Sequence, residues 1–150
     1  MKKFITRMAA ALCALHFAAG VQQATAQVAS LYSFSQSSGT QTLISGGTKL
    51  TSGSTFDDAQ YAVSIPNFYF DGNWYGTMYV STNGFITFGS APATNNFTPL
   101  SSTATYTGAI SPFGADIMNS GSGTREVRWQ QVGTEVVVQW QGARRVNSAN

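Results

Sequence analysis

Three turn signals divide the middle and the end of this chain into segments of strand length. Asp71-Gly72 and Asn83-Gly84 are residue pairs that readily adopt the positive φ angles of a two-residue hairpin turn. Gly133-Thr134 separates two runs in which apolar and polar residues alternate. Alternation places successive side chains on opposite faces of a strand, and short turns join antiparallel strands. The sequence therefore predicts antiparallel hairpins, and no helical periodicity follows residue 27.

The other predicted strands are short runs between loops rich in Ser, Thr, Gly and Asn. The full set of predicted strands is 31–35, 48–50, 65–70, 74–82, 85–88, 109–117, 125–132 and 135–142. Sparse charge and many hydroxyl and aromatic side chains are typical of a secreted β-sandwich. We therefore expect an all-β, antiparallel β-sandwich. Because the sequence after residue 142 is polar and predicts no closing strand, we expect this sandwich to be incomplete at its C-terminus.

Turn length predicts the register of two hairpins. Two-residue turns give the pairs Tyr79–Phe88, Val80–Thr87, Ser81–Ile86 and Thr82–Phe85 in the middle of the chain, and Trp129–Val138 and Val127–Trp140 near its end. The middle hairpin has apolar residues on both faces, which predicts a central position. The last hairpin has one apolar face, so we expect its tryptophans in the core and its other face in water.

The first 26 residues have the three parts of a secretory signal peptide: a positive start, the apolar stretch 8–21, and the small-x-small sequence Ala24-Thr25-Ala26. Cleavage after Ala26 leaves Gln27 as the new N-terminus. The apolar stretch is shorter than the about 20 residues of a membrane-spanning helix, and no later segment is apolar enough to span a membrane. We therefore expect a signal peptide at 1–26 and a secreted or cell-surface β-sandwich module at 27–150.

Removal of the signal peptide removes Cys13 and His16, the single cysteine and the single histidine of the sequence. The mature chain then forms no disulfide and no Ser-His-Asp or Cys-His site, and it lacks the ligands that zinc, copper and iron prefer. It keeps five cations and six carboxylates, a net charge of −1. Arg144 and Arg145 are its one adjacent pair of cations, so we expect no nucleic-acid binding. The composition favours a protein that is not an enzyme.

Aromatic side chains on the strand that follows the first turn are candidates for sugar binding. Trp74, Tyr75 and Tyr79 can offer a platform on which sugar rings stack. The alternative is core packing, because sandwiches commonly bury the aromatic residues of their strands. Both interpretations stay open at the level of the sequence.

Asp57-Asp58 is a candidate calcium site, since calcium takes carboxylate and carbonyl oxygens from loops. One adjacent pair does not supply the roughly 6–8 ligands that calcium needs, and solvated loop carboxylates are the alternative. No other cofactor is expected. For Asp116 we expect a structural ion pair with Arg144 or Arg145 rather than a catalytic role.

The segments 80–89 (Val-Ser-Thr-Asn-Gly-Phe-Ile-Thr-Phe-Gly) and 110–117 (Ile-Ser-Pro-Phe-Gly-Ala-Asp-Ile) resemble the nidogen-like pattern of extracellular modules. With the opening segment 32–40 and the late Val138-Gln139-Trp140, the chain also resembles N-terminal β-domains of secreted proteins from Bacteroidetes-type bacteria, which are type IX secretion cargo. The resemblance spans most of residues 30–146 and implies an extracellular, non-catalytic sandwich that precedes further domains. Gly114 departs from the pattern, because nidogen-like modules often carry Trp there.

Two functions therefore remain under consideration. The first is a non-catalytic extracellular module with a structural, binding or adhesion role, whose partner is an unknown extracellular protein or a glycan. The alternative is an accessory or catalytic domain of a secreted polysaccharide-degrading protein. A glycosidase needs two carboxylates about 5–10 Å apart across the scissile bond, and no motif in the sequence proposes such a pair.

Overall fold

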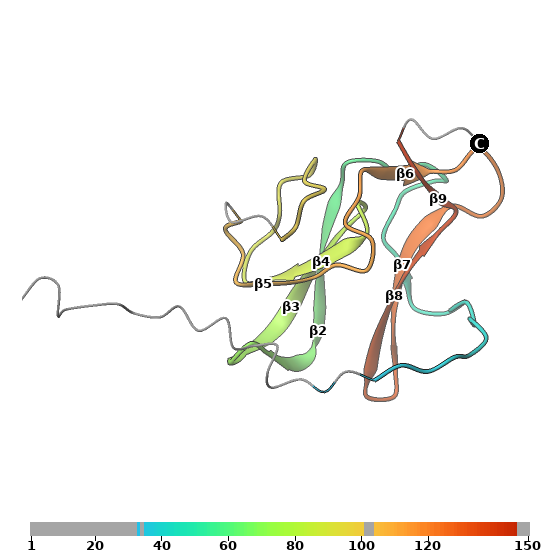
Figure 1. Cartoon of the computed structure of the whole chain (residues 1–150). Helices are drawn as coiled ribbons and strands as arrows, with labels where there is room; N and C mark the ends of the chain where they lie inside the picture. The colour runs from blue at the N-terminus through green and yellow to red at the C-terminus, as the bar shows by residue number, and fades with distance from the viewer. Residues whose placement is uncertain (1–32, 34, 101–103, 147–150) are drawn as a thin grey trace, which may run out of the picture. The chain divides into compact units, whose positions relative to one another are not determined.

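The computed structural model describes residues 33, 35–100 and 104–146. Residues 1–38 form one unit and residues 39–150 another, and every described strand lies in the second (Figure 1). The strands are β1 (Thr48–Lys49), β2 (Gln60–Phe70), β3 (Asn73–Ser81), β4 (Phe85–Phe88), β5 (Gly108–Ile110), β6 (Ile117–Asn119), β7 (Glu126–Val132), β8 (Glu135–Gln141) and β9 (Ala143–Arg145). Within these described residues, no helix is long and apolar enough to cross a membrane. The predicted signal peptide and its cleavage site lie outside the described residues, as does most of the predicted strand 31–35.

Three antiparallel sheets build the second unit, with strand orders β2-β3-β4-β5, β1-β7-β8 and β6-β9. The core lies between the first two sheets: Met78, Val80 and Phe88 of the larger sheet cluster with Val127 of the smaller one. The indole Nε1 of Trp140 donates a hydrogen bond of 2.8 Å to the Ser81 carbonyl, which joins the same two sheets. The predicted all-β, sandwich-like fold is confirmed.

The β2–β3 hairpin has the predicted turn. Phe70 pairs with Asn73, and the two residues between them have positive φ angles, 47° at Asp71 and 79° at Gly72. β2 begins at Gln60, ahead of the predicted start at Ile65, because Gln60 to Ser64 also pair with β3. The register is interrupted between Ser64 and Phe68. Pro66 lies within this interruption, where its missing N–H group removes a donor from the strand pairing.

The β3–β4 hairpin corrects a register prediction. Its turn holds three residues, 82–84, instead of the two that we assumed, so Ser81 pairs with Phe85 and Tyr79 pairs with Thr87. Gly84 has a φ of 77°, as the last residue of such a three-residue turn requires. Every predicted pair is therefore shifted by one position on β3. The predicted central position is confirmed, since Val80 and Phe85 are both fully buried.

The β7–β8 hairpin has the predicted register: Trp129 pairs with Val138, and Val127 pairs with Trp140. Its polar face is less exposed to water than we predicted. Gln139 is buried there, and its Oε1 accepts a hydrogen bond of 2.9 Å from the backbone N–H of Ile44. The segment ahead of β1 therefore covers part of this face. β1 itself confirms the short edge strand that we predicted at 48–50.

The last third of the chain adds to the prediction in two places. The strand-like segment expected at 109–117, with its interruption at Pro112 and Gly114, is two short strands, β5 and β6, and the chain between them turns at Gly114, whose φ is 51°. A strand that we did not predict, β9, follows residue 142 and pairs with β6 in a separate two-stranded sheet. Gly142 makes this possible: its φ is 62°, and a Cβ there would lie 2.4 Å from the Thr124 carbonyl oxygen.

We predict that Trp140→Phe lowers the free energy of unfolding by about 1–3 kcal/mol, because it leaves the buried Ser81 carbonyl without its indole donor. Urea denaturation measures this. Trp129→Phe is the matched control, since no hydrogen bond joins the Trp129 indole to another described residue. Equal losses in the two variants would show that the bond to Ser81 does not stabilise the fold.

Candidate functional site

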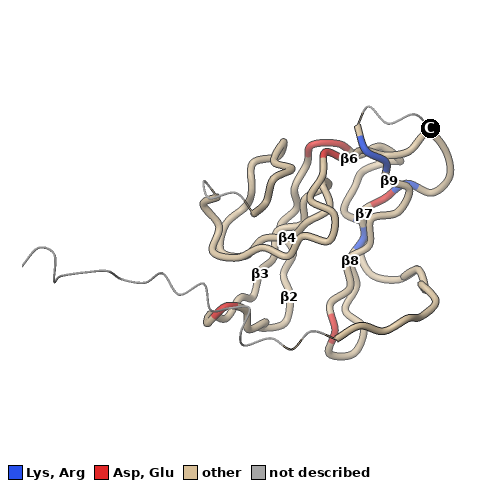
Figure 2. The backbone as a smooth tube through the Cα atoms, viewed as in Figure 1, with Lys and Arg blue, Asp and Glu red and all other residues tan. Residues whose placement is uncertain are grey.

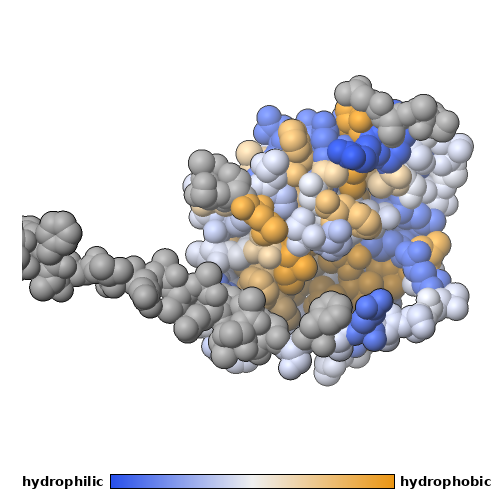
Figure 3. All heavy atoms as spheres, in the orientation of Figure 1, coloured by the Kyte–Doolittle hydropathy of each residue, from blue (hydrophilic) through white to orange (hydrophobic). Residues whose placement is uncertain are grey.

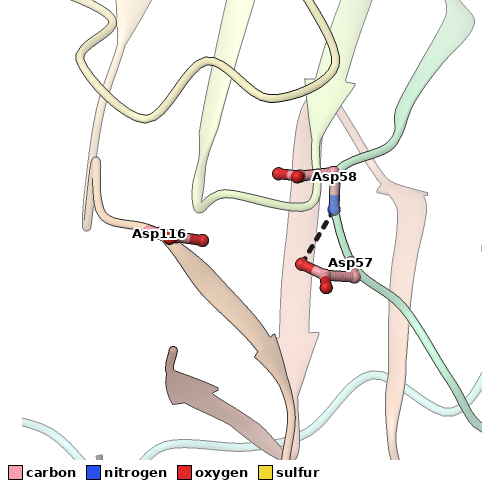
Figure 4. Close-up of side chains that lie close together, drawn as sticks. All are labelled: Asp57, Asp58 and Asp116. Carbon is pink, nitrogen blue, oxygen red and sulfur yellow. Dashed lines mark hydrogen bonds between the residues drawn. The ribbon is translucent and has the colours of Figure 1, made fainter. Parts of the chain in front are cut away.

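Three carboxylates meet where the loop before β2 approaches the segment before β6 (Figure 4). Asp57 and Asp58 belong to the loop, and Asp116 directly precedes β6. One carboxylate oxygen from each residue lies within 4.8 Å of the others. The sequence singles out Asp57-Asp58 as a pair, and the fold adds a third carboxylate to them.

The buried side chain of Asn83 holds this cluster together from the β3–β4 turn. Its Nδ2 donates hydrogen bonds of 3.1 Å to Oδ1 of Asp58 and 3.2 Å to the Asn96 carbonyl. Its Oδ1 accepts a hydrogen bond of 3.1 Å from the backbone N–H of Ile117, the residue after Asp116. Asn83 has no exposed surface; its bond with Ile117 is buried, and its bonds with Asp58 and Asn96 are part-buried. One amide therefore fixes the separation between the two segments that carry the carboxylates.

The surroundings of Asp57 change the pKa of its carboxyl group. Burial raises the pKa of its carboxyl group above the ordinary value, and the neighbouring negative charges of Asp58 and Asp116 raise it further. A hydrogen bond of 3.1 Å from the Asp58 backbone N–H to Asp57 Oδ1 opposes this rise (Figure 4). Three carboxylates at this spacing repel one another, so a bound cation would relieve the repulsion.

Figure 2 shows acidic and basic residues close together along β7, and two ion pairs involve the first residue of that strand, Glu126. Its carboxylate accepts a hydrogen bond of 2.7 Å from Nε of Arg128 and lies 3.9 Å from Nζ of Lys49. The bond from Arg128 is the main cause that lowers the pKa of Glu126 below its ordinary value. The contact with Lys49 joins β7 to β1, while Arg128 and Glu126 both belong to β7. No sequence motif pointed to these structural ion pairs.

Asp116 stands with Asp57 and Asp58, while the two arginines predicted as its partners belong to β9. In the β6–β9 pair, Arg144 lies opposite Met118 and Arg145 lies opposite Ile117. The backbone carbonyl of Asp116 accepts a hydrogen bond of 2.9 Å from the N–H of Val146. The backbone thus brings β9 close to Asp116, and the predicted side-chain ion pair stays a prediction.

The structure separates the three aromatic residues that we considered as a platform. Trp74 is 68% exposed, whereas the ring of Tyr75 packs 5.1 Å from that of Phe88 and its hydroxyl lies 2.8 Å from Thr107 Oγ1. Tyr79 is half-buried. The ring nearest to Trp74 among those described is that of Tyr69, on the neighbouring strand, at 5.1 Å. The sequence could have predicted this pair, because the two-residue turn at 71–72 places Tyr69 opposite Trp74.

An apolar cavity of about 440 Å³ lies between the larger sheet and β8. Its apolar lining includes Ile65, Phe68, Met78, Ile86, Phe88, Ile110, Val136 and Val138. Figure 3 shows apolar residues gathered on the molecular surface between these elements. None of the three clustered carboxylates lines this cavity. The acidic cluster and this apolar cavity are thus separate features.

Comparison with known proteins gives a family and no close relative. A family model described as NIDO related matches residues 31–150. No curated protein matches the chain, and no solved structure does. The matched range includes every described strand, the acidic cluster and the β2–β3 hairpin.

We predict that Asp57→Asn raises the melting temperature at pH 7, without added calcium, by roughly 1–4 °C, the range expected for one exposed charge contact in a domain of this size. The pKa of Asp57 is raised in the folded protein, so its ionised form destabilises the fold at neutral pH. This destabilisation disappears as the pH falls through the folded pKa toward the ordinary value of 3.8. The melting temperatures of variant and wild type should therefore converge in acid.

Thermal melts from pH 7 to pH 4 in EDTA test this expectation. Glu135→Gln, which removes an exposed carboxylate from the β7–β8 turn, is the control for a change in net charge. A rise of the same size in both variants would assign the effect to net charge and not to the cluster.

Proposed function

The chain belongs to the NIDO-related family, and on that premise we propose that its β module is a non-catalytic extracellular domain with a binding or structural role. The observation that carries this proposal is the extent of the family match, which takes in residues 31–150. The same match includes the three clustered carboxylates, so these belong to the module itself. An extracellular type of β module agrees with the signal peptide that the first 26 residues predict.

The chemistry of the mature chain supports a non-catalytic role. It has no histidine and no cysteine, so general acid–base work falls to carboxylates. Asp57 and Asp58 are exposed, and the cluster does not line the apolar cavity. A hydrolase of the glycosidase type needs one carboxylic acid held protonated beside the substrate in a water-poor site. Exposed carboxylates at the end of a sheet do not offer that environment.

We place the proposed role outside the cell. The mature protein would begin at Gln27 and meet an extracellular protein or a glycan as part of a longer, adhesin-like protein. Transport by type IX secretion is the route that the sequence resemblance implies. A structural role is also consistent with this setting, because modules of this kind stand ahead of other domains.

The acidic cluster is the part of this proposal that concerns a ligand. Its three carboxylates would supply part of the 6–8 oxygen ligands that calcium takes, and peptide carbonyls and water would supply the rest. The bonds of Asn83 hold Asp58 and the start of β6 at a fixed separation before any ion binds. A cation at this place would cancel the repulsion that raises the pKa of Asp57. We therefore propose calcium as the cofactor to test.

We predict no hydrolytic activity in the purified mature protein, residues 27–150. The assay incubates it with a panel of polysaccharides, peptides and esters and measures released products. Turnover that Asp58→Asn or Asp116→Asn abolishes would contradict the proposal and favour the alternative, a domain that acts on polysaccharides. Turnover that survives every Asp and Glu substitution would identify a contaminating enzyme.

We predict that calcium stabilises the wild-type protein, by about 2.7 kcal/mol when its concentration is 100 times the dissociation constant. Thermal melts in calcium chloride, with magnesium chloride at the same ionic strength as control, measure the effect. Asp116→Asn should remove the calcium-dependent rise, and Glu135→Gln should keep it. An equal rise with both salts, or a rise that Asp116→Asn leaves intact, would reject the calcium site.

A further inference from the structure

The outer end of the β2–β3 hairpin carries two exposed aromatic rings. Trp74 is 68% exposed and Tyr69 is 56% exposed. They face each other across the strand pair, with ring centroids 5.1 Å apart and ring planes inclined by 57°. Phe68, Phe70 and Tyr75, their neighbours along the strands, pack instead on the buried Phe88. The hairpin therefore sorts its aromatic residues into a group that packs on Phe88, of which Phe68 is still 39% exposed, and the more exposed pair Tyr69 and Trp74.

The hairpin changes its inward-facing residues between its two ends. Val63 and Met78, which pair with each other, both lie in the core. Beyond the irregular stretch between Ser64 and Phe68, Phe68 pairs with Tyr75, and both rings pack on Phe88. Because side chains alternate along a strand, the next pair, Tyr69 and Trp74, is turned outward. Strict alternation from Val63 and Met78 would instead place this pair in the inward set.

The surface beside Trp74 is low and polar. Gly76 is two residues further along β3, so it follows Trp74 on the same face, about 7 Å away. It has no side chain to rise beside the indole, and a Cβ there would meet just the amide oxygen of Asn67, at 3.6 Å. Asn67 and Asn73 are both exposed. A flat aromatic ring thus lies next to hydrogen-bonding amide groups.

Cross-strand packing explains the Tyr69–Trp74 pair in part, since such aromatic pairs stabilise a hairpin by about 0.2–1 kcal/mol. It does not require that both rings keep more than half of their surface exposed. The patch is also too small for a stable protein partner, which needs about 800 Å² on each side. A ring-sized ligand with an apolar face and a polar rim fits it better.

We propose that Trp74 and Tyr69 form a binding site for a pyranose ring of an extracellular glycan. Trp74 stacks against the C–H face of the sugar, the inclined ring of Tyr69 contacts its edge, and Asn67 accepts or donates hydrogen bonds at its hydroxyls. A β-linked glucose unit suits such a site, because its equatorial hydroxyls leave both ring faces apolar. This inference rests on the proposed binding role and gives that role a ligand class.

The site stands apart from the acidic cluster. β2 begins two residues after Asp58, and its far end is Phe70, next to the hairpin turn (Figure 1). The two features therefore lie at opposite ends of the same strand. Glycan binding at the hairpin should be independent of the cluster, and substitutions in the cluster should leave it unchanged.

The test titrates the mature protein, residues 27–150, with cellohexaose and follows binding by isothermal titration calorimetry and by tryptophan fluorescence. We expect a dissociation constant within about an order of magnitude of 1 mM, as befits a small contact. Trp74→Ala should weaken binding by at least about tenfold, as loss of a central tryptophan does in other interfaces. Trp74→Phe should restore part of the affinity, and Tyr69→Ala should cause a smaller loss than Trp74→Ala.

Phe97→Ala is the matched control, because Phe97 is an aromatic residue that is 46% exposed outside this hairpin. It should bind as the wild type does, and thermal melts of each variant confirm that it is folded. No saturable binding by the wild type, or equal binding by wild type and Trp74→Ala, would overturn the proposal. Such a result leaves the non-catalytic role untouched, whereas cleavage of cellohexaose in the same samples would contradict that role.

Discussion

The loops around the acidic cluster depend on the hydrogen bonds of the Asn83 side-chain amide. It is fully buried in the β3–β4 turn and bonds to three separate segments: Asp58 before β2, Asn96 in the long loop, and Ile117 at the start of β6. The amide is itself buried, so leaving its donor and acceptor groups unsatisfied would be costly. The turn therefore acts as the point from which the loops around the acidic cluster are positioned. A residue that the sequence marks as a turn former also has a structural role that its turn does not require.

The sequence predicted those parts of the fold that depend on contacts within one hairpin. The Asp71-Gly72 turn and the register of β7–β8 followed from turn length and alternation, and both are confirmed. The turn at 82–84 was misread, because Asn83-Gly84 has the composition of a two-residue turn and closes a three-residue one. Composition alone did not separate these cases. The third residue is Thr82, whose side chain and backbone N–H both bond to Ala59, the residue just before β2.

The candidate sites were likewise predictable only where they depend on residues that are close in the sequence. Asp57 and Asp58 are neighbours in the sequence, but the approach of Asp116 depends on the path between β5 and β6, which Gly114 and the Asn83 amide determine. For the aromatic residues, the irregular stretch of the β2–β3 pair limits the prediction. Alternation along β3 separates Trp74 from Tyr75, but counted from the buried Met78 it would turn Trp74 inward, whereas Tyr75 packs on Phe88 and Trp74 lies outside. Long-range geometry therefore limits what the sequence predicts at both sites.

The two sites also differ in how the fold holds them. Hydrogen bonds of the buried Asn83 help to hold the carboxylates together against their mutual repulsion, and burial together with that repulsion raises the pKa of Asp57. The aromatic pair has no such constraint, because it stands on a regular hairpin end where a two-residue turn alone sets the facing positions. Removing one member of the cluster therefore changes the stability of the loops around Asn83, whereas removing Trp74 changes little besides its own surface. The module can therefore vary its ligand contacts at the hairpin without disturbing the hydrogen bonds of Asn83 that position the loops around the carboxylates.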